Sequence, residues 1–108
     1  MSGETLKGHL DMLLLAAIAS EPAYGYVISE RLKARSGGVF DLPEGTIYPA
    51  LHRLEKGGYL QSGWERGESG RRRRVYALTP AGEQALLLQR RSWEAFSGGV
   101  AGILETQG

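Results

Sequence analysis

The sequence predicts a mainly α-helical fold that carries a single β-hairpin. Three stretches with helical composition or spacing occupy the first half of the chain, and each is followed by proline or glycine. Two strand-like runs with period-two alternation then flank the glycine-containing stretch GESG, and one long helical pattern follows them. The chain has 108 residues, which is the length of one domain, and we expect one hydrophobic core rather than two.

The first two helices are defined by apolar content and by the breakers behind them. Gly8–Ser20 is rich in Leu and Ala, which predicts a largely buried helix, and Pro22 cannot continue its hydrogen-bond ladder. The second helix is predicted in Tyr26–Gly38, where the apolar residues recur at helical spacing. The pair Gly37-Gly38 supplies its stop.

The third helix carries one apolar stripe, because Ile47, Leu51 and Leu54 keep the i, i+4, i+7 spacing of a buried face. Pro49 is compatible with a helix that begins close to it, within the first turn. The pair Gly57-Gly58 ends this element.

A β-hairpin is predicted next, with Leu60–Arg66 as one strand and the run RVYAL as the other. Alternation places Trp64, Tyr76 and Leu78 on the side that we expect to face the core. Four consecutive arginines, Arg71–Arg74, lead into the second strand.

A final helix begins with Thr79 as N-cap and Pro80 at the first helical position. We therefore divide the chain into a domain of residues 1–79 and a C-terminal helix and tail of residues 80–108. The glycines after residue 97 weaken its later turns. Apolar residues recur along it with coiled-coil-like steps: Leu86, Trp93, Phe96, Val100 and Ile103.

Composition narrows the class of function. The chain has no cysteine and two distant histidines, His9 and His52, and no glycine-rich phosphate motif, so we expect neither an enzyme nor a cofactor or metal site. The longest apolar run, Met12–Ala19, is too short to cross a bilayer, and we expect a cytoplasmic protein without membrane association. Net charge is +1, yet residues 31–74 carry ten Lys/Arg against five Asp/Glu, which indicates a surface that faces a polyanion.

Three helices followed by a two-stranded wing and a C-terminal helix form the winged helix-turn-helix arrangement. At this level the chain resembles the PadR family of bacterial transcriptional regulators over residues 6–82. The resemblance rests on GTIYPALHRLEKGGYL, the downstream GRRRRVYALTPAG and the earlier YGYVI. It implies a homodimeric repressor that binds an inverted-repeat DNA operator, with a short C-terminal dimerisation helix.

The candidate DNA-binding residues lie on the third helix, on the wing and, for Tyr24, at the start of the second helix. Glu55 is expected to pair with Arg53 or Lys56 rather than with DNA. Alternation sends Arg71 and Arg73 to one face of the wing and Arg72 and Arg74 to the other, and we favour Arg72 and Arg73 as contacts over a merely solvated edge strand. The full candidate set is Thr46, Tyr48, Pro49, His52, Arg53, Lys56, Arg71, Arg72, Arg73, Arg74 and Tyr24. Of Tyr24 and Tyr26, we expect one in the core and the other at the DNA backbone.

Two interpretations of Trp93 stay open. It anchors the dimer seam together with Leu86, Phe96 and Val100, or, as the resemblance implies, it stacks a small planar aromatic effector near the dimer dyad. An alternative for the whole chain is a winged-helix module that binds protein or RNA and has no operator of its own.

Overall fold

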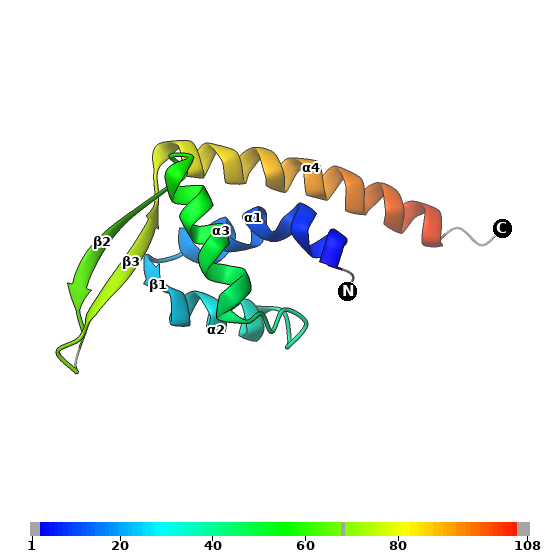
Figure 1. The fold of residues 1–108 in the computed structure, drawn as a ribbon. Coiled ribbons are helices and arrows are strands. Elements are labelled where there is room, and N and C mark those ends of the chain that lie inside the picture. The colour runs from blue at the N-terminus through cyan, green and yellow to red at the C-terminus, as the bar shows by residue number, and fades with distance from the viewer. Residues whose placement is uncertain (1–2, 68, 106–108) are drawn as a thin grey trace.

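The computed structural model describes residues 3–67 and 69–105, with side chains from His9 onward. It contains four helices and three strands among these residues, and the hairpin projects from one end of the helical layer (Figure 1). The elements, in chain order, are α1 (Gly3–Ala19), β1 (Ala23–Tyr24), α2 (Gly25–Arg35), α3 (Glu44–Lys56), β2 (Leu60–Arg66), β3 (Arg72–Leu78) and α4 (Pro80–Glu105).

Helix α1 occupies the middle of the molecule and contacts α2, α3, α4 and β3. Its residues Leu14, Leu15 and Ile18 are fully buried, as the Leu- and Ala-rich composition predicted, although the helix starts before Gly8. The stripe predicted for α3 is confirmed, because its three apolar residues pack into the same core. Burial of these side chains is the main stabilising contribution, at about 25 cal/mol per Å² of apolar surface removed from water.

The sheet contains one strand more than the sequence predicted. Its order is β1-β3-β2, and all pairs are antiparallel. The two-residue strand β1 pairs Ala23 with Tyr76 and Tyr24 with Val75, so β3 is the central strand at the root of the wing. Beyond Val75 only β2 accompanies β3, and the hairpin leaves the helical layer as a two-stranded arm (Figure 1).

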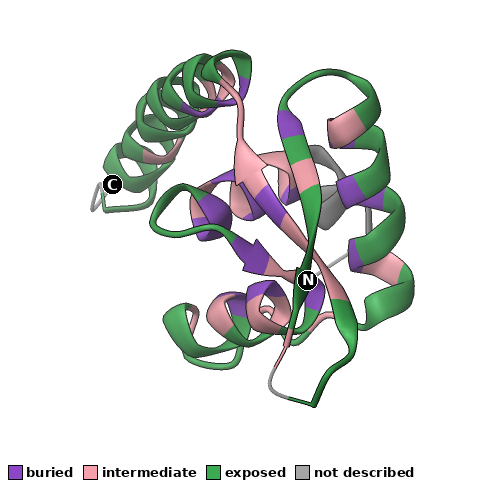
Figure 2. Ribbon diagram, turned by 90° about the vertical axis from the view of Figure 1, so that its left-hand side faces the viewer, coloured by how far each residue is buried: buried purple, intermediate pink, exposed green. Residues whose placement is uncertain are grey.

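The prediction that Trp64 faces the core is wrong. Tyr76 is 1% exposed and Leu78 packs against the core, as predicted, but Trp64 is 58% exposed. Trp64 and Tyr76 do lie on one face of the hairpin, since Ser62 pairs with Tyr76 and Trp64 with Arg74. The outer part of the hairpin is mostly exposed (Figure 2), and Trp64 lies one position beyond Gly63, where the pairing of β1 with β3 ends.

Helix α3 begins earlier than Pro49 suggested. Pro43 is its N-cap and Glu44 its first residue, which places Pro49 in the second turn rather than the first. A proline there lacks the N–H that would bond to the carbonyl four residues earlier. The apolar stripe on the opposite face holds the helix together despite this missing bond.

Helix α4 is capped as predicted and continues through its glycines to Glu105. The Thr79 hydroxyl accepts a hydrogen bond from the Gly82 amide at 3.0 Å and donates to the Gly58 carbonyl at 2.6 Å. The Thr79 amide donates to the Tyr59 carbonyl at 3.2 Å. These bonds tie the start of α4 to the turn that ends α3. The division of the chain between residues 79 and 80 stays a prediction. Helix α4 packs along α1, so the two predicted parts contact each other.

Within residues 3–105, excluding Glu68, no helix combines the length and apolar character that a membrane span requires. The same residues contain no group of three His, Cys, Asp or Glu side chains placed to bind a metal ion.

Candidate nucleic-acid interface

Helix α3 presents a polar face toward the wing and solvent. Tyr48, Pro49, His52 and Lys56 are exposed, and Thr46 is half-buried near the start of the helix. Residues 48, 52 and 56 follow one another at intervals of four and therefore share one side of the helix. Hydroxyl, imidazole and ammonium groups on an exposed helix face are able to bond phosphate oxygens or base edges.

Arg53 lies on a different side of α3, where it contacts α1. Its two terminal nitrogens donate to the two carboxylate oxygens of Asp11 at 2.9 and 2.7 Å. This side-chain hydrogen bond raises the pKa of Arg53. The bidentate pair fixes α3 on α1, and it engages the guanidinium that we had expected to bond a guanine.

Glu55 does not pair with Arg53 or Lys56, which corrects the prediction from sequence spacing. It accepts a hydrogen bond from the Ser62 hydroxyl of β2 and forms an ion pair with Arg74 of β3 at 3.4 Å. Arg74 Nε also donates to the Ser62 oxygen at 2.7 Å. The Ser62 bond, opposed by desolvation and assisted by the charge of Arg74, lowers the pKa of Glu55. The network joins the root of the wing to α3.

The four arginines of the wing occupy different environments. Arg72 and Arg74 both contact the Trp64 indole, with guanidinium carbons 5.0 and 5.4 Å from the ring centroid. Arg73 lies on the opposite face and stacks 4.5 Å over the ring of Tyr24. Aromatic faces attract cations, so these contacts offset part of the repulsion between neighbouring arginines. Arg71 is exposed before the start of β3.

A hollow of about 420 Å³ lies where α2, α3 and the wing meet. Its lining includes Tyr24, Gly25, Tyr26 and Tyr48, with three arginines of β3 on the other side. Gly25 lets the Tyr48 ring lie against the start of α2, because a Cβ atom there would lie 2.5 Å from the Tyr48 hydroxyl oxygen. The three arginines that complete the lining are Arg72, Arg73 and Arg74.

The expectation that one of Tyr24 and Tyr26 lies in the core is not met. Tyr26 is 59% exposed and lines the hollow, and Tyr24 is half-buried, so neither tyrosine is fully buried. The residue that the sequence reasoning missed on this surface is Trp64, which it assigned to the core. The signal available for Trp64 was its position opposite an arginine in the predicted hairpin, where core contacts are absent.

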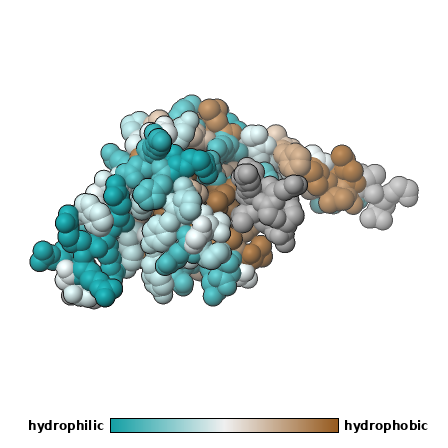
Figure 3. All heavy atoms as spheres, viewed as in Figure 1, coloured by the Kyte–Doolittle hydropathy of each residue, from teal (hydrophilic) through white to brown (hydrophobic). Residues whose placement is uncertain are grey.

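The surface is polarised along the length of the molecule. Hydrophilic side chains gather over the hairpin at one end, and hydrophobic side chains gather on the outer part of α4 at the other (Figure 3). The apolar residues of α4 with exposed side chains include Trp93, Phe96 and Val100. Leu86 differs from these, because it is buried in the core of its own chain.

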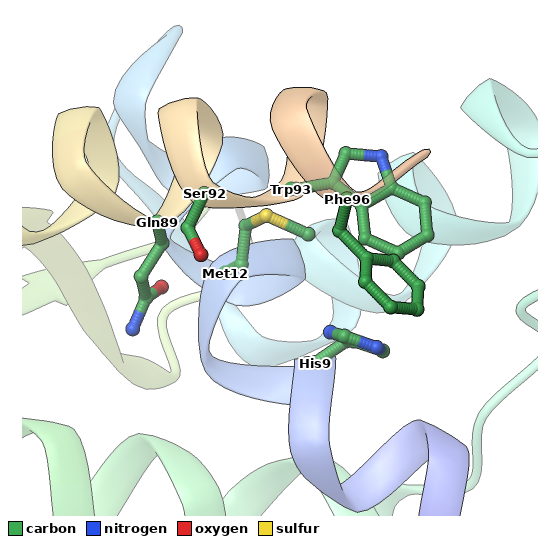
Figure 4. A pocket seen from close by; sticks show the side chains of 6 residues that line it. All are labelled: His9, Met12, Gln89, Ser92, Trp93 and Phe96. Carbon is green, nitrogen blue, oxygen red and sulfur yellow. The ribbon is translucent and has the colours of Figure 1, made fainter. Parts of the chain in front are cut away.

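A second pocket, of about 310 Å³, lies between α1 and α4 (Figure 4). The His9 ring meets the Trp93 ring edge-on with centroids 5.0 Å apart, and Phe96 lies 6.0 Å from Trp93. Met12, Gln89 and Ser92 complete the lining. Gln89 Oε1 is buried and has no hydrogen-bond donor among the described residues.

Three helices, an arginine-rich wing joined to the third helix, and a tyrosine-lined hollow between them define a winged helix-turn-helix protein. The comparison with protein families agrees with this class. Residues 14–87 match the model of the transcriptional regulator PadR-like family. The chain therefore belongs to the PadR-like family and is a transcriptional regulator, not an enzyme.

Known proteins are similar to this chain over most of its length. The transcriptional regulator Rv3488 of Mycobacterium tuberculosis is 40% identical over 89 residues, which are 82% of this chain and 79% of the relative. The crystal structure of the PadR-like regulator BC4206 of Bacillus cereus superposes with a TM-score of 0.85 at 30% identity, covering 97% of this chain and 100% of the other. A PadR family regulator of Eggerthella lenta gives 0.79 at 36% identity, covering 96% and 88%.

Proposed function

We propose that this regulator is a repressor that binds an inverted-repeat DNA operator as a homodimer. The convergence of α3, the start of α2 and the wing on one basic hollow carries the proposal. Tyrosine hydroxyls and arginine guanidiniums are donors suited to the phosphates of a DNA backbone. A hollow lined by both, beside an exposed helix face, supports double-stranded DNA as the ligand.

In this proposal α3 enters the major groove and the wing follows the neighbouring backbone. Thr46, Tyr48, His52 and Lys56 lie on or near the face that meets the groove, and Pro49 lies beside them. Arg71, Arg72 and Arg73 supply phosphate or minor-groove contacts from the wing. Arg74, held by Glu55 and Ser62, orients the wing instead of binding DNA directly.

The homodimer is proposed from the unpaired apolar side of α4. Trp93 is 40% exposed and Phe96 is 63% exposed, and Val100 extends the same side of the helix. A second copy related by a two-fold axis would bury the same residues on both chains. Trp93→Ala should then yield monomers in sedimentation velocity and weaken DNA binding through lost bivalency. A dimer that persists in this variant would contradict the proposal that Trp93 lies in the dimer interface.

Selection of duplexes from a random-sequence pool tests sequence recognition without knowledge of the regulated genes. We expect an inverted repeat to be enriched, and its affinity to fall steeply with salt because arginines displace counterions from phosphates. Binding that is strong but indifferent to sequence would refute the repressor. No binding at moderate salt would leave the protein-interaction or RNA-binding alternative.

A paired variant tests the wing directly. Arg72→Ala/Arg73→Ala should weaken binding to the selected duplex while the sedimentation coefficient of the dimer stays unchanged, because these residues lie on the wing and not on α4. The matched control is Arg90→Ala/Arg91→Ala, which removes the same charge from an exposed part of α4. Equal loss of affinity in both pairs would indicate a general charge effect instead of a wing contact.

We further propose that the pocket between α1 and α4 binds a planar aromatic effector that releases DNA. The Trp93 and Phe96 rings and the His9 ring supply stacking surfaces, and the unpartnered Gln89 Oε1 favours an effector that carries an N–H or O–H donor. In a Trp64→Phe variant, aromatic compounds should quench Trp93 fluorescence, and compounds that carry such a donor should do so at lower concentration than compounds without one. Gln89→Leu should abolish this difference between the two kinds of compound. Quenching that depends neither on the donor of the compound nor on Gln89 would contradict this assignment.

A further inference from the structure

We infer that Trp64 of the wing is itself a DNA-contacting residue, whose indole packs against deoxyribose in the minor groove beside Arg72. The inference rests on the proposed DNA-binding function and adds an uncharged, apolar contact to it. It concerns a residue outside the helix that reads the major groove and outside the run of arginines.

The position of Trp64 is the first observation. It is on the edge strand β2, opposite Arg74 and beyond the part of the hairpin that the helices support. Its side chain is 58% exposed, the largest exposed aromatic surface of the wing. Packing within this chain therefore accounts for less than half of the indole surface, and the remainder faces outward.

The second observation is the charge around it. Arg72 and Arg74 approach the indole at 5.0 and 5.4 Å, and Arg74 is in turn fixed by Ser62 and Glu55. Arg74 thus contacts both the network at the root of the wing and the indole, and the indole contacts Arg72 in turn. An aromatic surface with a cation beside it matches the alternation of apolar sugar and anionic phosphate along a DNA strand.

Charge complementarity favours DNA over a protein partner for this surface. The wing presents arginines on both of its faces, and an apolar protein surface placed on Trp64 would have to desolvate Arg72 as well. A DNA backbone pairs with that guanidinium while its deoxyribose covers the indole. Minor-groove proteins likewise combine basic side chains with apolar ones, although their apolar side chains insert between base steps.

The test uses the fact that the chain has only two tryptophans. In a Trp93→Phe variant, Trp64 is the single fluorescent indole, and acrylamide quenching reports its exposure. We expect saturation with the selected duplex to reduce the quenching constant by about half or more, because sugar atoms would cover the exposed indole surface. An unchanged quenching constant at saturation, with DNA demonstrably bound by anisotropy, would overturn the inference.

Wild-type protein labelled with 5-fluorotryptophan provides the same test if Trp93→Phe impairs assembly. It should give two fluorine resonances, assigned with Trp64→Phe, and the Trp64 resonance should shift on addition of the duplex. A Trp64 resonance that stays in place while the protein binds would also overturn the inference.

Salt dependence separates a contact from a positioning role. Trp64→Ala should lower affinity about tenfold, as loss of an aromatic contact to a nucleotide does, with an unchanged slope of log K against log salt. Arg72→Ala should lower the magnitude of that slope by about one for each wing, and so by about two for the proposed dimer. If Trp64→Ala instead reduces the slope as Arg72→Ala does, Trp64 only positions the arginine. Absence of DNA binding in the unmodified protein would be a failure of the proposed function and not of this inference alone.

Discussion

Replacing Glu55 by glutamine should lower the free energy of unfolding of the protein and yet raise its affinity for DNA. Glu55 joins α3 to the wing through Ser62 and Arg74, and it places a negative charge beside the basic hollow. The substitution keeps the shape of the side chain and removes its charge. Arg74 then loses its ion-pair partner and becomes available to a phosphate.

The magnitude follows from the geometry of the pair. Unit charges 3.4 Å apart attract by about 1.2 kcal/mol in bulk water, and side-chain ordering reduces that value. Solvent screening applies here because the Arg74 side chain is 40% exposed and that of Glu55 is 24% exposed. Adding a weakened bond from the Ser62 hydroxyl, we expect a loss of about 1 to 1.5 kcal/mol in the free energy of unfolding.

The effect on DNA has the opposite sign. One additional guanidinium on a phosphate steepens the slope of log K against log salt by about 0.9, so the two copies in the proposed dimer steepen it by about 1.8. At low salt we expect each added contact to raise affinity by a factor of about five, equivalent to about 1 kcal/mol. Ser62→Ala is the matched control, because it removes the hydroxyl and its bond from Arg74 Nε but keeps the charge of Glu55 and its ion pair with Arg74.

The Glu55 carboxylate should also make the stability of the protein depend on pH. Its pKa is lowered in the folded protein, first by the Ser62 hydrogen bond, with Arg74 and His52 contributing through their charges. A lowered pKa means that this stabilisation is fully present above the ordinary pKa of glutamate and is lost as the pH falls through the lowered value. Wild-type stability should therefore converge with that of Glu55→Gln at acidic pH.

Urea unfolding at fixed protein concentration and fluorescence anisotropy across a salt series measure the two effects. Fixed concentration matters because the stability of a homodimer depends on it. Glu55→Gln with wild-type stability at neutral pH, or with an unchanged salt slope, would refute the reasoning that Glu55 restrains Arg74.

Three glycines give the remaining predictions. Gly82→Ala would place a Cβ atom 2.0 Å from the Tyr59 carbonyl oxygen and should destabilise the protein by about 3 kcal/mol or more, measured by urea unfolding. Gly98→Ala, where a Cβ meets nothing within 4 Å, should instead stabilise α4 by up to about 1 kcal/mol. Gly25→Ala would displace the Tyr48 ring, and we expect weaker DNA binding in a mobility shift assay with little change in melting temperature.

These outcomes separate backbone constraint from site geometry. A stable Gly82→Ala protein would mean that the turn after α3 and the start of α4 can move apart. Gly25→Ala with normal DNA affinity would remove Tyr48 from the interface, whereas a large fall in melting temperature would show that its contact with Gly25 supports the fold.

Local patterns in the sequence were sufficient for the helices and for the cap of α4. The i, i+4, i+7 stripe of α3 and the Thr-Pro start of α4 are properties of short segments, and both are confirmed. The wing was also predicted, because GESG joins two alternating runs. The short strand β1 was missed, since two residues carry no period and its pairing with β3 depends on the folded arrangement.

Features that depend on where the core ends could not be obtained this way. Alternation assigned Trp64 correctly to the face of Tyr76, but it contains no information on how far the helices extend along that face. Likewise, spacing favoured partners of Glu55 on its own helix, and the observed partners come from two strands. Asp11 and Arg53 are 42 positions apart, and their contact depends on how α1 and α3 pack.

The hydrogen bonds of Thr79 fix the first residues of α4 to the turn after α3, and the rest of the helix extends from that point as a lever. With 26 residues the helix is about 39 Å long, so a change of about 5° in its direction displaces its far end by about 3 Å. In the proposed dimer, two such levers would meet near Trp93 and Phe96. A small molecule that alters their crossing angle there would change the separation of the two α3 helices, and with it the spacing of half-sites that the protein accepts.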